Sequence, residues 1–304
     1  MAEDASHSHN PFDAAHLIGH VKDADYFEVP RNLAAGGKLK IPQPFQLEKP
    51  LFEVADKQSM AGRLIEPLDF KLTKFMILEV VAAFIVAVIF IVLAQRMSRA
   101  GKPLGRLWNL FETMLVFIRD EVARPAIGRH DADRFLPLLW TMFFFVLGCN
   151  LLGMVPWAGS ATGALATTGA LALVTFGTVV GSGMAKMGPV GFWTGQVPHM
   201  ELHPAMGVLL KPMIFLIEVM GLLIKHFILA IRLLANMLAG HLVLVVIMTF
   251  IVATAGHVAW PGVAAASVLG ATALSLLELF VAFLQAYIFT FLSALFIGMA
   301  VHPH

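Results

Sequence analysis

The chain has 304 residues, of which 58% are hydrophobic and only 13% are charged. A soluble domain is about half apolar and about a quarter charged, and the apolar excess here lies in long runs, so the sequence predicts an all-α membrane protein that crosses the bilayer several times. The net charge of +1 lacks the surplus of Lys and Arg that indicates a nucleic-acid partner. The single cysteine, Cys149, excludes an intramolecular disulfide and a cysteine-based metal site.

Residues 1–74 are mixed in charge and interrupted by proline and glycine, which indicates an N-terminal tail outside the membrane. A short amphipathic helix is expected in the stretch FDAAHLIGHV. We expect no cleavable signal peptide, because no basic region precedes an apolar one at the start. The polytopic membrane domain is predicted to occupy residues 75–304.

The first membrane span is predicted at residues 75–94, close to the ~20 residues that cross a hydrocarbon core. Many Lys and Arg residues follow it in the loop 95–134, and such a concentration marks the cytoplasmic side. Within this loop, LWNLFETMLVFIRDEVA has helical periodicity with its charges on one side. It is therefore predicted to be an amphipathic helix along the membrane interface.

Two ordinary spans are predicted next, at residues 135–155 and 162–183. The first is closed by Pro156. The second is rich in Ala, Gly and Thr, small residues that allow membrane helices to approach closely. A loop broken by glycine and proline follows.

The last two spans, at about 209–255 and 263–300, are much longer. Residues 213–254 contain no proline and no polar turn, and a helix of this length extends ~60 Å, about twice the ~30 Å core. We therefore predict two long, strongly tilted helices that form a hairpin. Five spans with the 95–134 loop inside put the N-terminus outside and the C-terminus in the cytoplasm. The sequence has no internal repeat, which argues against inverted-repeat transporter folds.

Few polar side chains interrupt the two long runs. A charge at membrane depth costs about 2.5–3.5 kcal/mol on insertion scales, so each is expected to face a water-filled cavity or a partner, or to be a paired or snorkelling structural charge. The candidate site residues are Glu218, Lys225, His226, Arg232, Asn236, His241, Glu278 and Gln285.

Helical geometry sorts these residues. Successive residues rotate by about 100°, so Arg232 and Asn236 share a face, Glu218 and Lys225 lie within roughly 40° of it, and His241 points to roughly the opposite side. On the last run, Glu278 and Gln285 are seven positions apart and therefore also share a face.

These two residues, Glu278 and Gln285, complete a polar lane on two facing helices, with His241 and Glu278 as candidate proton carriers. Arg232 cannot relay protons by titrating, because arginine keeps its proton. No acid lies within a turn of it on its own helix, so it is free to meet a carboxylate of another subunit and to favour the ionised form of that acid.

The stretch IKHFILAIRLLANMLAGHLVL resembles the signature of subunit a of F-type ATP synthases, the stator channel protein of the membrane sector. NLFETMLVFIRDEVARPAIG, CNLLGMVP and LLELFVAFLQAYIFTFLSALFIGMAV are also similar to that family. The four motifs occur in the family's order, and the resemblance extends from about residue 75 to the end of the chain.

The resemblance implies a role for each matching residue. Arg232 stands at the family's essential arginine, with Asn236 four residues beyond it and Gln285 at the glutamine of the last helix. Glu218 matches the acid on the cytoplasmic exit side.

The remaining matches concern titratable residues. His241 and Glu278 fall where some bacterial members carry Glu and His, so the acid and the imidazole are exchanged here. Lys225 matches a common basic position, and His226 follows it.

The function implied by the resemblance is proton conduction through two offset half-channels. The implied partners are the c-ring subunits, the b-type peripheral stalk subunits, the rest of the ATP synthase complex and membrane lipid. The chain would be a non-catalytic translocation subunit without cofactor or metal, and it has no Walker-type phosphate loop for nucleotide. The implied location is a bacterial inner (plasma) membrane, or the mitochondrial inner membrane if the chain is organellar.

Two alternatives stay open from the residues alone. A secondary transporter or anion channel would use Arg232 to bind a carboxylate or phosphate of its substrate. A structural membrane anchor would tolerate the neutralisation of Arg232 and Glu278 together.

Overall fold

The computed structural model describes residues 23–28, 38–43, 72–100, 105–155, 159–196 and 204–302, and the helix expected in FDAAHLIGHV lies outside these ranges. Within them, five helices are long and apolar enough to cross a membrane, which confirms the predicted number. They are α3 (Lys74–Ala100), α6 (Ala132–Gly153), α7 (Leu165–Met187), α9 (Pro204–Ala253) and α10 (Trp260–Val301).

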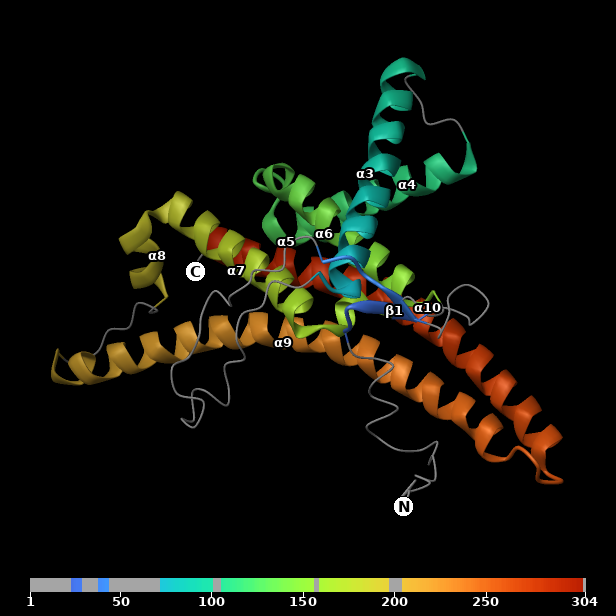
Figure 1. Ribbon diagram of the computed structural model, residues 1–304. Helices are drawn as coiled ribbons and strands as arrows, with labels where there is room; N and C mark the ends of the chain where they lie inside the picture. The colour runs from blue at the N-terminus through green and yellow to red at the C-terminus, as the bar shows by residue number, and fades with distance from the viewer. Residues whose placement is uncertain are drawn as a thin grey trace.

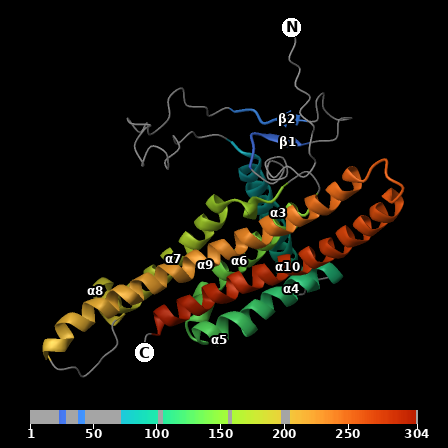
Figure 2. The same cartoon turned by 90° about the horizontal axis from the view of Figure 1, so that it is seen from below.

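A small antiparallel sheet precedes the first span. It pairs β1 (Tyr26–Glu28) with β2 (Lys38–Lys40), next to the beginning of α3 (Figure 2). The carboxylate of Asp23 accepts a hydrogen bond from the backbone N–H of Phe75 at 3.3 Å, which satisfies a free donor in the first turn of α3. The sequence did not predict these strands, because three residues are too few to show an alternating pattern.

The predicted amphipathic helix is present as one continuous helical segment of three parts: α4 (Arg106–Phe117), the π-helix η1 (Ile118–Ala123) and α5 (Arg124–Ile127). No residue of α4 is buried, whereas η1 buries Ile118, Val122 and Ala123. Phe111, Met114 and Leu115 of α4 pack against the core while partly exposed, so the segment becomes fully buried only from its π turn onward. Its location at a membrane interface stays a prediction.

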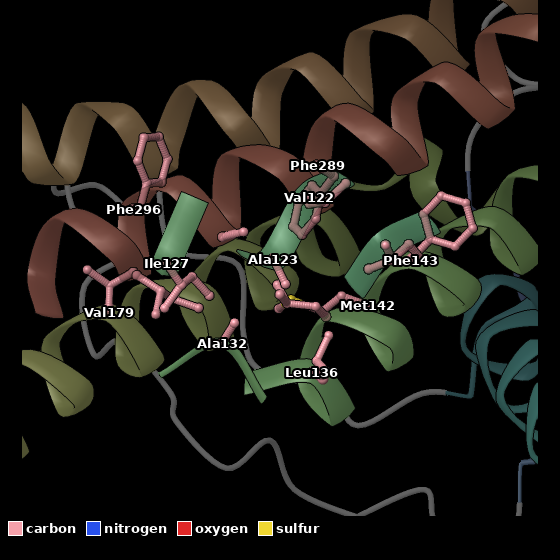
Figure 3. Close-up of a cluster of buried hydrophobic side chains, with 14 of the residues drawn as sticks. Val122, Ala123, Ile127, Ala132, Leu136, Met142, Phe143, Val179, Phe289 and Phe296 are labelled. Atoms are coloured by element: carbon pink, nitrogen blue, oxygen red, sulfur yellow. The ribbon is translucent and has the colours of Figure 1, made fainter. Parts of the chain in front are cut away.

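The main hydrophobic core lies where η1, α5, α6, α7 and α10 meet (Figure 3). Leu139 and Val146 of α6 are fully buried there, as are Phe289 and Ile297 of α10. Gly298 is required at this junction, because a Cβ at that position would overlap the backbone carbonyl of Ala126. The core thus fixes the last third of α10 against the earlier helices.

The two long helices are continuous, as predicted. α9 has 50 residues and α10 has 42, so at 1.5 Å per residue they are about 75 and 63 Å long, roughly twice the ~30 Å hydrocarbon core. Such helices fit within a bilayer only if they are strongly tilted. They run side by side (Figure 2), and α9 is gently arched (Figure 1).

The boundaries of α9 differ from the prediction at its start. The helix begins at Pro204, before the predicted residue 209, and it includes Pro212. Proline is favourable at the first helical position because its missing N–H has no helical partner there. After the end of α9, Gly256 has φ 92°, a left-handed conformation that reverses the chain toward α10.

Two short helices complete the described chain. The 3₁₀ helix η2 (Ala161–Gly163) lies between α6 and α7, and it contacts α3, α6, α7 and α9. Helix α8 (Pro189–Gly195) follows α7 and packs back on it. The helices of the bundle alternate in direction, so the start of α3, the end of α6 and the start of α7 meet near η2.

Candidate functional site

Two polar side-chain pairs join α9 to α10. Asn236 Nδ2 donates a hydrogen bond to Gln285 Oε1 at 2.8 Å. Further along α9, His241 Nδ1 lies 3.4 Å from Glu278 Oε1. The two pairs follow the antiparallel register of the hairpin, and they bring four of the eight candidate residues together.

His241 is surrounded by oxygen atoms. Its Nδ1 also lies 3.0 Å from the carbonyl oxygen of Met237, and its Nε2 lies 2.8 Å from the carbonyl oxygen of Gly153, at the end of α6. An imidazole donates from both nitrogens only when it carries two protons. The number of contacts that His241 makes therefore changes when it gains or loses a proton.

Glu278 is 9% exposed, and its Oε1 atom has no hydrogen-bond partner among the described residues. Gly240 makes room for this carboxyl group, because a Cβ at Gly240 would overlap it. A buried carboxylate whose acceptors are not all filled is destabilising on its own. The position of Glu278 thus depends on a glycine of the facing helix and on His241.

Arg232 lies one turn before Asn236 on α9 and is half-buried. Within the described ranges it forms no ion pair, in contrast to Arg119 of η1 and Arg124 of α5. The amide nitrogen of Gln285 is also buried without a partner there. The centre of the hairpin therefore holds a permanent cation without an acidic partner and a buried donor without an acceptor among the described residues.

The remaining acidic and basic candidates on α9 lie elsewhere. Glu218 and Lys225 are exposed and line a cavity of about 270 Å³ together with Gln196 and residues of α8 and α10. Glu218 is 14 residues before Arg232, a distance of about 21 Å along the helix. The structure thus separates Glu218 and Lys225 from the two pairs.

His226 does not join either group. It is 4% exposed, its Nδ1 lies 2.8 Å from the carbonyl oxygen of Leu222, and its ring packs between Phe176 and Phe296. It lines a nearly apolar cavity of about 530 Å³ between α7 and α9. Its surroundings are those of a packed core histidine.

Some polar groups near this site were missed in the sequence. Glu79 of α3 accepts a hydrogen bond from the hydroxyl of Thr167. Asn150 donates to the carbonyl oxygen of Ala282 at 3.3 Å and accepts from Thr162 at 2.8 Å. A search for charged residues within apolar runs would also have found Glu79 in FMILEVV. No sequence spacing indicates that Asn150 pairs with Thr162.

A charged cluster lies at the other end of the bundle, near the predicted cytoplasmic loop. Asp120 accepts hydrogen bonds from Arg119 and Arg124, and Asp131 accepts one from Lys186 at 2.6 Å. The hydrogen bond from Arg119 lowers the pKa of Asp120, and the hydrogen bond from Lys186 lowers the pKa of Asp131. These charges join η1 to α5, and the start of α6 to the end of α7.

The fold and the site define a class of protein: a multi-pass helical membrane protein with a buried imidazole–carboxylate pair between two overlong helices. A family model described as ATP synthase A chain matches residues 76–298. That match covers more than half of the chain, so this chain belongs to the ATP synthase A chain family.

Curated relatives agree with this assignment. The chain is 43% identical over 250 residues to ATP synthase subunit a of Myxococcus xanthus (strain DK1622), covering 81% of this chain and 79% of the relative. It is 39% identical over 238 residues to ATP synthase subunit a of Chloroherpeton thalassium, covering 77% and 67%. The match to ATP synthase subunit a of Anaeromyxobacter dehalogenans (strain 2CP-C), 39% identical over 240 residues, covers 78% of this chain and 60% of that relative.

Family membership confirms the resemblance that the four motifs indicate. It makes the chain a subunit of the membrane sector of an ATP synthase and gives the rest of that complex as its partner. The five apolar helices make it a multi-pass membrane protein.

Proposed function

We propose that this chain is the proton-conducting stator subunit of an F-type ATP synthase. It offers two offset half-channels to and from a carboxylate of the c ring, and Arg232 separates them. The observation that carries the proposal is the half-buried Arg232 on α9, which has no acidic partner among the described residues. A permanent charge at membrane depth requires a partner, and a carboxylate of another subunit supplies one.

The outer half-channel leads to the two polar pairs. Protons from outside reach His241 and Glu278, pass Asn236 and Gln285, and protonate the ring carboxylate. The contacts of His241 suit this role, since both its nitrogens face oxygen atoms. The neutral ring carboxyl then faces lipid, which the charged form does not do because its desolvation is too unfavourable.

The inner half-channel leads away past Glu218. After nearly a full turn of the ring, the carboxyl reaches the cavity lined by Glu218 and Lys225 and loses its proton there. His241 lies about 14 Å beyond Arg232 along α9, and Glu218 lies about 21 Å before it. Arg232 therefore stands between the two paths, where it blocks direct leakage and favours ionisation of the arriving acid.

The proposal gives the subunit specific partners and an orientation. The c ring lies against α9 and α10, whose length and tilt follow its curved surface, and b-type peripheral stalk subunits and membrane lipid surround the rest. The N-terminus is outside and the C-terminus in the cytoplasm of a bacterial inner membrane, because the basic loop 95–134 lies inside. The chain itself carries out no catalysis.

Affinity purification of the tagged chain from detergent-solubilised membranes tests this function. We expect an oligomeric c ring and a soluble ATPase head to co-purify with it, and ATP hydrolysis to acidify reconstituted vesicles. A chain that purifies without them and transports an organic anion when reconstituted alone would instead be a secondary transporter or an anion channel.

A further inference from the structure

Glu79 is an acid inside a membrane span that the proposed proton path does not use. It lies on the second turn of α3 and is half-buried, and it accepts a hydrogen bond from the hydroxyl of Thr167, which is itself buried. One short contact satisfies only part of a carboxylate, which has about four acceptor sites. Glu79 is therefore held in place and is still able to accept a proton.

Glu79 lies at the end of the bundle that is predicted to face outside. It is five residues into α3, Thr167 is the third residue of α7, and Asn150 is three residues before the end of α6. Because these helices alternate in direction, the three residues lie at the same end. The predicted cytoplasmic loop lies at the opposite end, so Glu79 has the depth expected of a group at the outer mouth.

The 3₁₀ helix η2 connects this end to the hairpin, since it contacts α3, α6, α7 and α9. Its Thr162 donates a hydrogen bond to Asn150, and the hydroxyl of Ser160, two positions before Thr162, lies 3.0 Å from that of Thr162. Asn150 in turn donates to the carbonyl oxygen of Ala282 on α10. Hydroxyl groups both donate and accept, so this cluster is able to relay hydrogen bonds between the helices.

The same cluster reaches the imidazole–carboxylate pair. A Cβ at Gly153 would lie 2.7 Å from the hydroxyl oxygen of Ser160, so the missing side chain allows Ser160 to approach the end of α6. The carbonyl oxygen of Gly153 lies 2.8 Å from His241 Nε2. Polar groups thus lie at both ends of this region: Thr167 contacts Glu79, and the cluster at η2 lies beside the end of α6 that His241 contacts.

We infer that Glu79 is a further proton-carrying residue, which takes up protons from outside water and delivers them toward His241 and Glu278. The carboxylate accepts a proton, becomes neutral, and returns to the carboxylate when the proton moves inward. The titratable group that Glu79 acts on is Cys149 of α6. Lys74 begins α3, and Asp23 contacts the first turn of that helix at the backbone of Phe75. This inference rests on the proposed function.

The test uses the complete ATP synthase complex in vesicles, with the rate of ATP synthesis measured at a fixed electrical potential while the pH on the outer side is varied. In Glu79→Gln the amide oxygen still accepts the hydrogen bond from Thr167, so the complex should assemble. We expect its rate to be roughly tenfold lower at neutral outer pH, at the low end of what a positioned proton-transfer group contributes. The deficit should shrink as the outer pH is lowered, with no change in the dependence on inner pH, and Glu79→Asp should restore most of the rate.

Two reference variants separate the possible failures. Glu121→Gln, which removes an exposed acid of η1 at the opposite end, should show the wild-type profile. Arg232→Ala should make no ATP in the same vesicles. A wild-type outer-pH profile in Glu79→Gln, with Arg232→Ala inactive, overturns the inference and leaves the proposed function standing, whereas an active Arg232→Ala complex overturns the proposed function itself.

If Glu79→Gln does not assemble, the same profile is measured on Thr167→Val, which keeps the acid but removes the hydroxyl that holds it. A shifted outer-pH dependence supports the inference. An unchanged profile overturns it.

Discussion

At the end of the bundle where α5, α6, α7 and α10 meet, partly exposed charged side chains pair with one another. Asp120 has two arginine partners, and Asp131 contacts Lys186 and His302. In the middle of α9 and α10 the polar atoms are buried more deeply, yet several of them have no partner among the described residues. Arg232 is only half-buried, but it too forms no ion pair among these residues.

Under the proposed function, this difference separates structural charges from functional ones. An exposed ion pair contributes about 0–1 kcal/mol, so each pair at the end of the bundle is replaceable and serves to orient helix ends. A charge at membrane depth costs about 2.5–3.5 kcal/mol. A charge that has no partner in its own chain recovers none of this free energy from the fold. The incomplete contacts of the hairpin are therefore best explained by contact with a second molecule and by side chains that bind and release protons.

Removal of the central charge should have the largest effect. In Arg232→Ala we expect ATP-driven proton pumping to fall roughly 100-fold or more, the size seen when a preorganised electrostatic group is removed. Fluorescence quenching of a pH dye in vesicles measures the pumping. Near-normal coupled pumping in this variant would contradict the distinction between the two regions. Arg232 would then be as dispensable for transport as Arg119.

Neutralising the buried acid should have the next largest effect. Glu278→Gln keeps the size of the side chain but removes its titration, so proton transport should slow roughly tenfold while the c ring still co-purifies. Proton flux and subunit composition are measured on the same preparation. Loss of the c ring would instead make Glu278 a structural residue.

A methyl group at the contact between the two helices should have a smaller effect. Gly240→Ala places a Cβ where the carboxyl group of Glu278 lies, so this carboxyl must move away from His241 and transport should slow. Gly177→Ala is the matched control on α7, since a Cβ there meets no atom within 4 Å. Equal proton flux in the two variants would show that the spacing of His241 and Glu278 is unimportant.

The exposed cluster should respond least. The pKa of Asp131 is lowered in the folded protein by Lys186, so its contribution to stability is present above the ordinary Asp pKa of about 3.9 and is lost as the pH falls through the lowered value. Asp131→Asn should lower the Tm by about one or two degrees at neutral pH, with no loss of proton transport. Thermal unfolding at several pH values checks this, and a difference that persists in strong acid would assign the effect to something other than the ionised carboxylate.

The helices were predictable because their signals are long. The unbroken apolar run after Lys211 indicates one helix rather than two, and α9 confirms it. The short strands β1 and β2 gave no such signal. Helix α9 begins at Pro204, before the predicted residue 209, and it continues through Pro212 although proline usually marks a break. Long periodic patterns determine the local structure whatever the segment packs against, whereas the structure of short segments depends on their tertiary contacts.

The site was predictable as a set of residues but not as a set of contacts. The cost of charge in a membrane singles out Arg232 and Glu278 from the sequence alone. The pairing of Asn236 with Gln285 depends on the register of the hairpin, and the contact of His241 with the end of α6 depends on how a third helix packs. Residues distant in sequence share no local pattern, so only the folded chain shows these partners.

Site-directed cross-linking within the assembled complex tests most directly that Arg232 faces an acid of another polypeptide. In a Cys149→Ala background, a cysteine is placed at Ala235, which is exposed near Arg232, or at Leu233, which is fully buried beside it. Each is oxidised against a cysteine next to the c-ring carboxylate. A disulfide with the c subunit from position 235 and none from position 233 is the predicted result. No disulfide from position 235, in a complex that retains its c ring, would contradict it.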